Sequence, residues 1–231
     1  MEFNFRKAFE TLGPSLLDGI GVVLYVTIVG FVLSLLLALL LAIGRLSKRK
    51  VIGRLLTIFI EFIRGTPLLV QFFYIYYVVP MLINGVGKSL GFDVNLQLEA
   101  TTCGIIGFAI NYGCYMSEVI RSSILSIDIG QQEAGVALGF SEKQVMFHFI
   151  IPPALRNSVP VFGNYLVMMI KDTSLLAMIS VQELLLRTKT YASQTFLTVE
   201  AYTMLALVYL LLSIPLSQLS GIIERKLKQG K

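Results

Sequence analysis

Residues 20–44 read IGVVLYVTIVGFVLSLLLALLLAIG, a run that contains no charged side chain. A helix needs about 20 apolar residues to cross the roughly 30 Å hydrocarbon core of a bilayer, so this run predicts a membrane-spanning helix. Because the run is too long for the apolar region of a signal peptide and has no small-residue cleavage site, we expect the span to be retained.

The rest of the chain has the same apolar character, with a mean hydropathy of +0.77 and charges on only 14% of its 231 residues. This composition excludes an ordinary water-soluble globular domain. Four further apolar runs are long enough to be spans, at residues 55–80, 99–122, 155–172 and 199–222. Lipid admits only helices and closed barrels, and the alternating pattern of a barrel is absent. The predicted fold class is therefore all-α, a polytopic membrane helical bundle with five transmembrane helices.

We expect three regions along the chain. Residues 1–19 mix aromatic and charged side chains, which is typical of an amphipathic helix lying at the membrane interface. Residues 20–222 would form the transmembrane domain, and residues 223–231 a basic cytoplasmic tail.

The basic residues predict the orientation of the bundle. Segment 45–54, RLSKRKVIGR, carries five of the 19 lysines and arginines, and segment 224–231, ERKLKQGK, carries four. The positive-inside rule puts both segments in the cytoplasm, with the N-terminus outside, the C-terminus inside and segment 123–154 also cytoplasmic. The net charge of +5 then reflects topology, and we expect no nucleic-acid partner.

Polar side chains inside the predicted spans are costly in lipid, which makes them candidates for a binding site. One candidate, Gln71, follows a Gly-Thr-Pro break in the second span. The other candidates belong to the third and fourth spans. Packing explains several of these residues as well as binding does, and an adjacent lysine and aspartate can neutralise each other or seek the charged groups of an amino acid. The candidates are Gln71, Asn111, Tyr112, Asn164, Tyr165, Lys171 and Asp172, together with the apolar Met168 of the fourth span.

Charged pairs near the cytoplasmic ends of two spans have i, i+3 spacing. Glu61 can reach Arg64 on the second span, and Glu118 can reach Arg121 on the third. We expect these pairs to be structural.

Two further patterns are expected to carry no chemistry. Cys103 and Cys114 lie on one predicted span about 16 Å apart, too far for a disulfide, so we expect buried free thiols and no metal site. Gly87-Lys88-Ser89 resembles the end of a phosphate loop, but the glycine that such a loop needs is replaced by Leu82. We predict no catalytic residues.

A polar segment interrupts the apolar chain at residues 128–153, DIGQQEAGVALGFSEKQVMFHFIIPP. Asp128 is placed to cap a short helix that stops at Gly139, and Ser141 with Gln144 would begin a second helix. Its apolar members are too few to enter the membrane, so they need either a partner groove or the membrane surface. The residues alone leave both possibilities open.

This segment resembles the cytoplasmic signature loop of importer-type ABC transporter permeases, whose usual form is E-A-A-x3-G-x9-I-x-L-P. Glu133, Ala134, Gly139 and Pro152 match it in register, Gly135 replaces the second alanine, and Phe149 and Ile151 stand at the two aliphatic positions. The stretches FIRGTPLLVQ at 62–71 and KDTSL at 171–175 further resemble the polar-amino-acid branch of that superfamily. The likeness covers essentially the whole chain.

The resemblance implies a fold like that of type I ABC importer permeases and a chain that is not itself an enzyme. Two permease subunits, identical or sister chains, would form the pore in the cytoplasmic (inner) membrane, and an extracytoplasmic solute-binding protein would deliver a polar amino acid. Separate ATPase subunits would bind ATP and Mg, leaving this chain without a cofactor, and would dock on a coupling loop at 126–153. The implied coupling residues are Gln132, Glu133, Ala134, Gly135, Leu138 and Gly139.

The resemblance also bears on the substrate. In branch members that carry cationic amino acids it suggests an acidic residue after the Gly-Asn of the fourth span, whereas this chain has Tyr165. A cation desolvated within the membrane needs a counter-charge, which argues against arginine, lysine or histidine as cargo. KDTSLLAMISVQEL resembles importers of cystine or of neutral and acidic polar amino acids, among which L-cystine is preferred.

Two other classes of function remain as alternatives. A secondary transporter would need titratable groups for ion coupling and an internal repeat, and no repeat is visible. A non-transport assembly subunit would need no polar residues at mid-membrane, where this chain has several.

Overall fold

The computed structural model describes residues 3–46 and 50–229, and all regular elements within these ranges are helical. Four helices have the length and composition of a membrane span, at residues 5–45, 68–89, 100–125 and 198–227. The helices Glu142–Ile179 and Leu184–Thr195, which meet at a bend of 53°, pass the same test together and make a fifth span if the pair is counted as one. The described chain is thus an all-α bundle of up to five membrane helices, as predicted.

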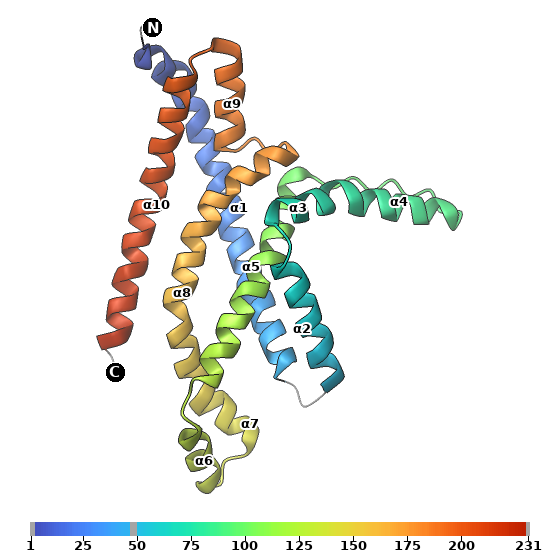
Figure 1. Cartoon of the computed structure of the whole chain (residues 1–231), viewed down its shortest axis with the longest axis vertical. Helices are drawn as coiled ribbons and strands as arrows, with labels where there is room; N and C mark the ends of the chain where they lie inside the picture. The colour runs from blue at the N-terminus through green and yellow to red at the C-terminus, as the bar shows by residue number, and fades with distance from the viewer. Residues whose placement is uncertain (1–2, 47–49, 230–231) are drawn as a thin grey trace.

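The first span belongs to a single long helix, α1 (Phe5–Arg45), of 41 residues. The Asn4 side chain caps its start by accepting a hydrogen bond from the Lys7 N–H at 3.0 Å. The helix continues without interruption through Pro14. The interfacial helix expected over residues 1–19 is therefore part of the same helix as the first span. The N-terminal part of α1 instead packs beside α9 (Leu184–Thr195), at the end of the molecule that also holds the N-terminus (Figure 1).

The second span differs from the prediction, because residues 55–80 are not one helix. Helix α2 (Lys50–Arg64) ends at the Gly-Thr-Pro sequence, where Pro67 is extended at φ −62° and ψ 137°. Proline has no N–H to continue the helical ladder, and its ring opposes the carbonyl four residues earlier. Helix α3 (Leu68–Phe73) then leaves in a new direction (Figure 1).

The arm that follows the break projects sideways from the bundle (Figure 1). It consists of α3, the π-helical turn η1 (Tyr74–Val78) and α4 (Val79–Ser89). The turn η1 ends two residues before Pro80, whose missing N–H favours a widened helical turn before it. The second candidate span is accordingly 68–89 and not 55–80.

Helix α5 (Ala100–Leu125) occupies the centre of the bundle and packs closely on α1. A Cβ atom at Gly30 would lie 3.2 Å from the Cβ of Phe108, and one at Gly113 would lie 3.0 Å from Leu37. Ser34 donates a hydrogen bond across the same contact to the Phe108 carbonyl at 3.1 Å. Small residues permit this close approach in membrane helices, and they fix the position of α5.

The polar segment after α5 forms a capped helix and a turn, as the sequence predicts. Asp128 accepts from the Gly130 N–H at 2.7 Å at the start of α6 (Ile129–Ala137). Gly139 then adopts a φ of +85°, and Ser141 and Gln144 form a capping box at the start of α7 (Glu142–Val145).

The second helix of this segment is not separate from the fourth span, contrary to expectation. Helix α7 continues through the π-helical turn η2 (Met146–Ile150) into α8 (Ile151–Asp172). Two prolines at the start of α8 lack the N–H groups that regular α-helical bonding requires, which explains the π turn before them. The helix of the fourth span therefore begins at Glu142 and not after Pro152-Pro153. At its other end, the 3₁₀ helix η3 (Thr173–Ile179) leads to the bend before α9.

The last span is α10 (Thr198–Gln229), which packs on α8 and α9. A Cβ atom at Gly163 of α8 would lie 2.6 Å from the Ser220 hydroxyl, so these two helices also meet at small residues.

The charged and sulfur-containing residues of the core follow the sequence analysis in most respects. Glu118 pairs with Arg121 at 3.1 Å and with Arg45 of α1, joining α5 to the end of α1. Cys103 and Cys114 are free, buried thiols. Lys48 and Arg49 of the basic loop lie outside the described residues, as do the last two residues of the basic tail.

Candidate functional site

A polar cavity of about 450 Å³ lies where the break after α2 meets α5 and α8. Helix α5 contributes residues at i, i+1 and i+4, and α8 contributes residues at i, i+3 and i+7, so each helix presents one face. The lining residues are Arg64, Gly65, Thr66, Pro67, Leu68, Asn111, Tyr112, Tyr115, Tyr165, Met168 and Asp172.

Tyr112 and Asp172 join the two helices that form the cavity wall. The Tyr112 hydroxyl donates a hydrogen bond to Oδ2 of Asp172 at 2.7 Å. The ring of Tyr112 also packs edge-on against Tyr165, with 5.8 Å between ring centroids. The carboxylate of Asp172 is therefore held at a fixed place on the cavity wall.

Arg64 supplies the positive charge at the cavity. Its guanidinium carbon lies 5.1 Å from the centroid of the Tyr115 ring, a cation–π arrangement. The Tyr115 hydroxyl donates to the carbonyl of Arg64 at 3.3 Å. The ion pair expected between Arg64 and Glu61 is not formed within the described part of the chain, because Arg64 lies over the ring instead.

Gln71 lies behind the cavity wall, although the sequence analysis placed it among the binding candidates. It is buried, and its amide nitrogen donates to the carbonyls of Ile63 at 2.7 Å and Thr66 at 3.1 Å. Its amide oxygen accepts from Nδ2 of Asn111 at 3.1 Å. Gln71 thus adds hydrogen bonds to two backbone carbonyls at the break, of which that of Ile63 also accepts from the Thr66 N–H at 3.3 Å, and it orients Asn111 toward the cavity.

The sequence candidates separate into two groups in the structure. The cavity brings together Asn111, Tyr112, Tyr165, Met168 and Asp172. Asn164 and Lys171 are exposed and do not line it. They are seven residues apart on α8, so they share a stripe that lies beside the cavity face.

Three polar lining residues, Arg64, Thr66 and Tyr115, were not among the predicted site members. Tyr115 follows Asn111 by four positions, so helical periodicity alone was sufficient to find it. Arg64 was expected to form an ion pair with Glu61. Its position as the last residue before the Gly-Thr-Pro break indicates instead that it borders the cavity formed there.

The cavity has the chemistry of a small-molecule binding site. One guanidinium, one carboxylate, tyrosine hydroxyls and an asparagine amide converge on a space of the size that small ligands occupy. Such a set can bind a molecule that carries both a negative and a positive group. Among the described residues, no cluster of three or more histidine, cysteine or acidic side chains could hold a metal ion.

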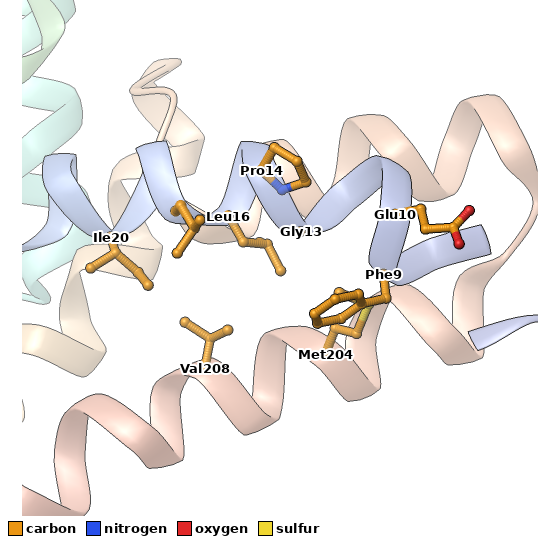
Figure 2. A pocket seen from close by; sticks show the side chains of 9 residues that line it. Phe9, Glu10, Gly13, Pro14, Leu16, Ile20, Met204 and Val208 are labelled. Carbon is orange, nitrogen blue, oxygen red and sulfur yellow. The ribbon is translucent and has the colours of Figure 1, made fainter. Parts of the chain in front are cut away.

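Another hollow of about 380 Å³ lies between the N-terminal part of α1 and α10 (Figure 2). Phe9, Leu16 and Ile20 face Met204 and Val208 across it. Glu10 is the charged residue of its lining. Without convergent polar groups this hollow cannot orient a polar ligand, so we do not regard it as the candidate site.

The second candidate region, α6, lies at the far end of the molecule from the N-terminus (Figure 1). Five of the six predicted coupling residues are exposed, namely Gln132, Glu133, Ala134, Leu138 and Gly139, whereas Gly135 is buried. The apolar side chain of Leu138 is 75% exposed, and that of Ile129 is 70% exposed. An exposed apolar helix at this place is suited to docking in the groove of another protein.

Comparisons with known proteins identify the family to which the chain is similar. A family described as binding-protein-dependent transport system inner membrane component matches residues 22–229 of the chain. The glutamine transport system permease protein GlnP of Escherichia coli (strain K12) is 32% identical over 99% of this chain and 99% of its own length.

Two further similarities are a cystine permease and a solved structure. The L-cystine transport system permease protein TcyB of Bacillus subtilis (strain 168) is 34% identical over 94% of this chain and 88% of its own length. The crystal structure of an amino acid ABC transporter with histidines superposes with a TM-score of 0.85 at 30% identity, and covers 98% of this chain and 100% of the solved one.

Proposed function

This chain belongs to the family of binding-protein-dependent transport system inner membrane components, as an amino acid ABC transporter permease, and from that premise we propose that it conducts a zwitterionic polar amino acid through the polar cavity. The observation that carries the proposal is the presence of Arg64 and Asp172 in the lining of one cavity.

The two charges match the two charged groups of an amino acid. Arg64 is placed to receive the α-carboxylate, since a guanidinium donates paired hydrogen bonds to carboxylates. Asp172 is placed to receive the α-ammonium group, and the Tyr112 hydroxyl fixes its orientation. The amide of Asn111 and the ring of Tyr165 then remain for the side chain of the substrate.

For the identity of the substrate we propose L-cystine first, as the sequence resemblance does. Similarity to TcyB supports this choice, as does Tyr165 in place of an acidic residue. L-glutamine is the competing candidate, supported by similarity to GlnP. The single cation and single carboxylate of the cavity match the one head group of glutamine, and they can equally hold one of the two head groups of cystine.

A competition experiment separates these substrates. The complete transporter, reconstituted in vesicles with its ATPase and binding protein, would be tested for uptake of labelled cystine and of labelled glutamine, each in the presence of other unlabelled amino acids. We expect neutral polar amino acids to compete and arginine and lysine to have little effect. Strong and exclusive inhibition by cationic amino acids would contradict the proposal.

Tyr165→Glu should shift the selectivity toward cationic amino acids, because the new carboxylate would neutralise a cationic side chain in the cavity. Competition by arginine is expected to improve by roughly tenfold, a change of about 1.4 kcal/mol in relative affinity. Asn164→Glu is the matched control, since it introduces the same charge one position away and outside the cavity lining. Equal shifts in both variants would show that the face of α8 bearing Tyr165 does not contact substrate.

We also propose that ATPase subunits dock on α6, that they bind ATP and Mg, and that a second permease subunit completes the pore. The exposed apolar side chains of α6 support the docking. The stripe of α8 with Asn164 and Lys171 supports a second subunit or a water-filled pore on that side, because exposed polar groups are costly against lipid. An external binding protein would deliver substrate.

We propose an orientation with the N-terminus outside and the C-terminus cytoplasmic. It is supported by the common location of the basic start of α2 and of α6 at the end of the molecule opposite the N-terminus (Figure 1).

A further inference from the structure

Helix α6 approaches the cytoplasmic extension of α8 unusually closely at one residue. Gly135 is the buried residue of α6, and all the other residues of that helix are exposed. A Cβ atom at Gly135 would lie 2.8 Å from Cγ2 and 3.2 Å from Cγ1 of Val145 in α7. Carbon atoms in favourable contact are about 3.5–4.0 Å apart, so the contact has no room for a methyl group.

The partner side chain cannot easily move aside. Val145 is 1% exposed, and its β-branched side chain has a single torsion with one strongly preferred rotamer in a helix. The turn between the two helices is held as well, because the Phe140 N–H donates to the Gly135 carbonyl at 3.2 Å. The ring of Phe140 also packs on Phe149, with 5.2 Å between ring centroids.

These contacts attach α6 to one membrane helix in preference to the other. Helix α7 continues through η2 into α8, whose face bears Tyr165, Met168 and Asp172 of the cavity. On the other side, residues 126–128 join α6 to α5 without helical structure. A movement of α6 is therefore transmitted to α8 through packed side chains and continuous helix.

We propose that Gly135 is a positioning residue that locks α6 against Val145, so that α6 and α8 move as one body and carry the motion of the ATPase to the cavity wall. This inference rests on the proposed docking of the ATPase on α6. It further implies that the sizes of the side chains at positions 135 and 145 depend on each other. The alanine usual at position 135 in similar loops then fits here only if Val145 is replaced by a smaller residue.

The experiment measures amino acid transported per ATP hydrolysed by the complete transporter in vesicles. Gly135→Ala is expected to lower this ratio by roughly tenfold, because overpacking forces α6 away from α7. The double variant Gly135→Ala/Val145→Ala should return to within about twofold of the original ratio, since residues in contact are not additive. Gly21→Ala on α1 is the control. It adds the same methyl group to a helical glycine where no other atom lies within 4 Å, so it should leave the ratio unchanged.

Val145→Ala alone provides a test that adds no bulk, so it remains informative if Gly135→Ala does not accumulate in the membrane. It should loosen the contact and lower the ratio by roughly threefold. A normal ratio in Val145→Ala, or a double variant as impaired as Gly135→Ala, would overturn the inference while the ATPase stays bound and active. Loss of the ATPase from the purified unaltered complex would instead overturn the proposed function, and this inference with it.

Discussion

Asp172→Asn is expected to lower ATP-driven amino acid uptake by at least about 30-fold, which corresponds to about 2 kcal/mol for the loss of one partner of a desolvated charge pair. The substitution preserves the shape of the side chain. An asparagine oxygen can still accept the hydrogen bond of the Tyr112 hydroxyl, which now reaches Oδ2 of Asp172 at 2.7 Å. The contact between α5 and α8 is therefore retained, and the effect isolates the charge that we propose receives the ammonium group.

The measurement is the concentration dependence of uptake in vesicles that contain equal amounts of each variant. Lys171→Gln is the matched control, because it removes the neighbouring charge on the same helix but lies outside the cavity lining. We expect this control to lose clearly less uptake than Asp172→Asn. Similar losses in both variants, or normal uptake by Asp172→Asn, would show that the Asp172 carboxylate does not bind substrate.

Glu133→Lys is expected to abolish uptake while the permease remains in the membrane at its normal level. Glu133 is exposed on α6 and lies two positions from the buried Gly135, which puts it on the opposite side of the helix. If its carboxylate pairs with a basic group of the ATPase, reversing the charge replaces an attraction with a repulsion that costs several kcal/mol. Retention of the ATPase on the purified permease should then fall by more than about tenfold.

Gln131→Lys serves as the control for added positive charge on α6. Gln131 is exposed and lies two positions from Glu133, on a different side of α6. The control should retain both the ATPase and uptake. Normal ATP-driven uptake by Glu133→Lys would remove the role of this residue in docking.

The local features of the fold were readable from the sequence because they depend on neighbouring residues. Ser141 and Gln144 form a capping box from three-residue spacing, and Gly139 takes the left-handed conformation that ends a helix. The apolar runs predicted the membrane helices because hydrocarbon thickness sets their length.

The features that were missed depend on distant parts of the chain. Pro67 predicts a break but does not determine the direction in which the arm leaves, so the span 55–80 was misplaced. Asn164 and Tyr165 are adjacent and both polar, and only the packing of α8 on α5 decides which of them enters the cavity. The closeness of Gly135 to Val145 likewise follows from packing and has no signature in a single sequence.

The hydrogen bonds of Gln71 stabilise the bent conformation of the chain at the break after α2. Straightening the chain there would separate its amide from the carbonyls of Ile63 and Thr66 in a buried place, where each lost bond is costly. The ligand then meets a wall that is already ordered, and little conformational entropy is lost when it binds. If the amino acid binds here and α8 moves as proposed, its contacts at the break should persist while those with α8 change.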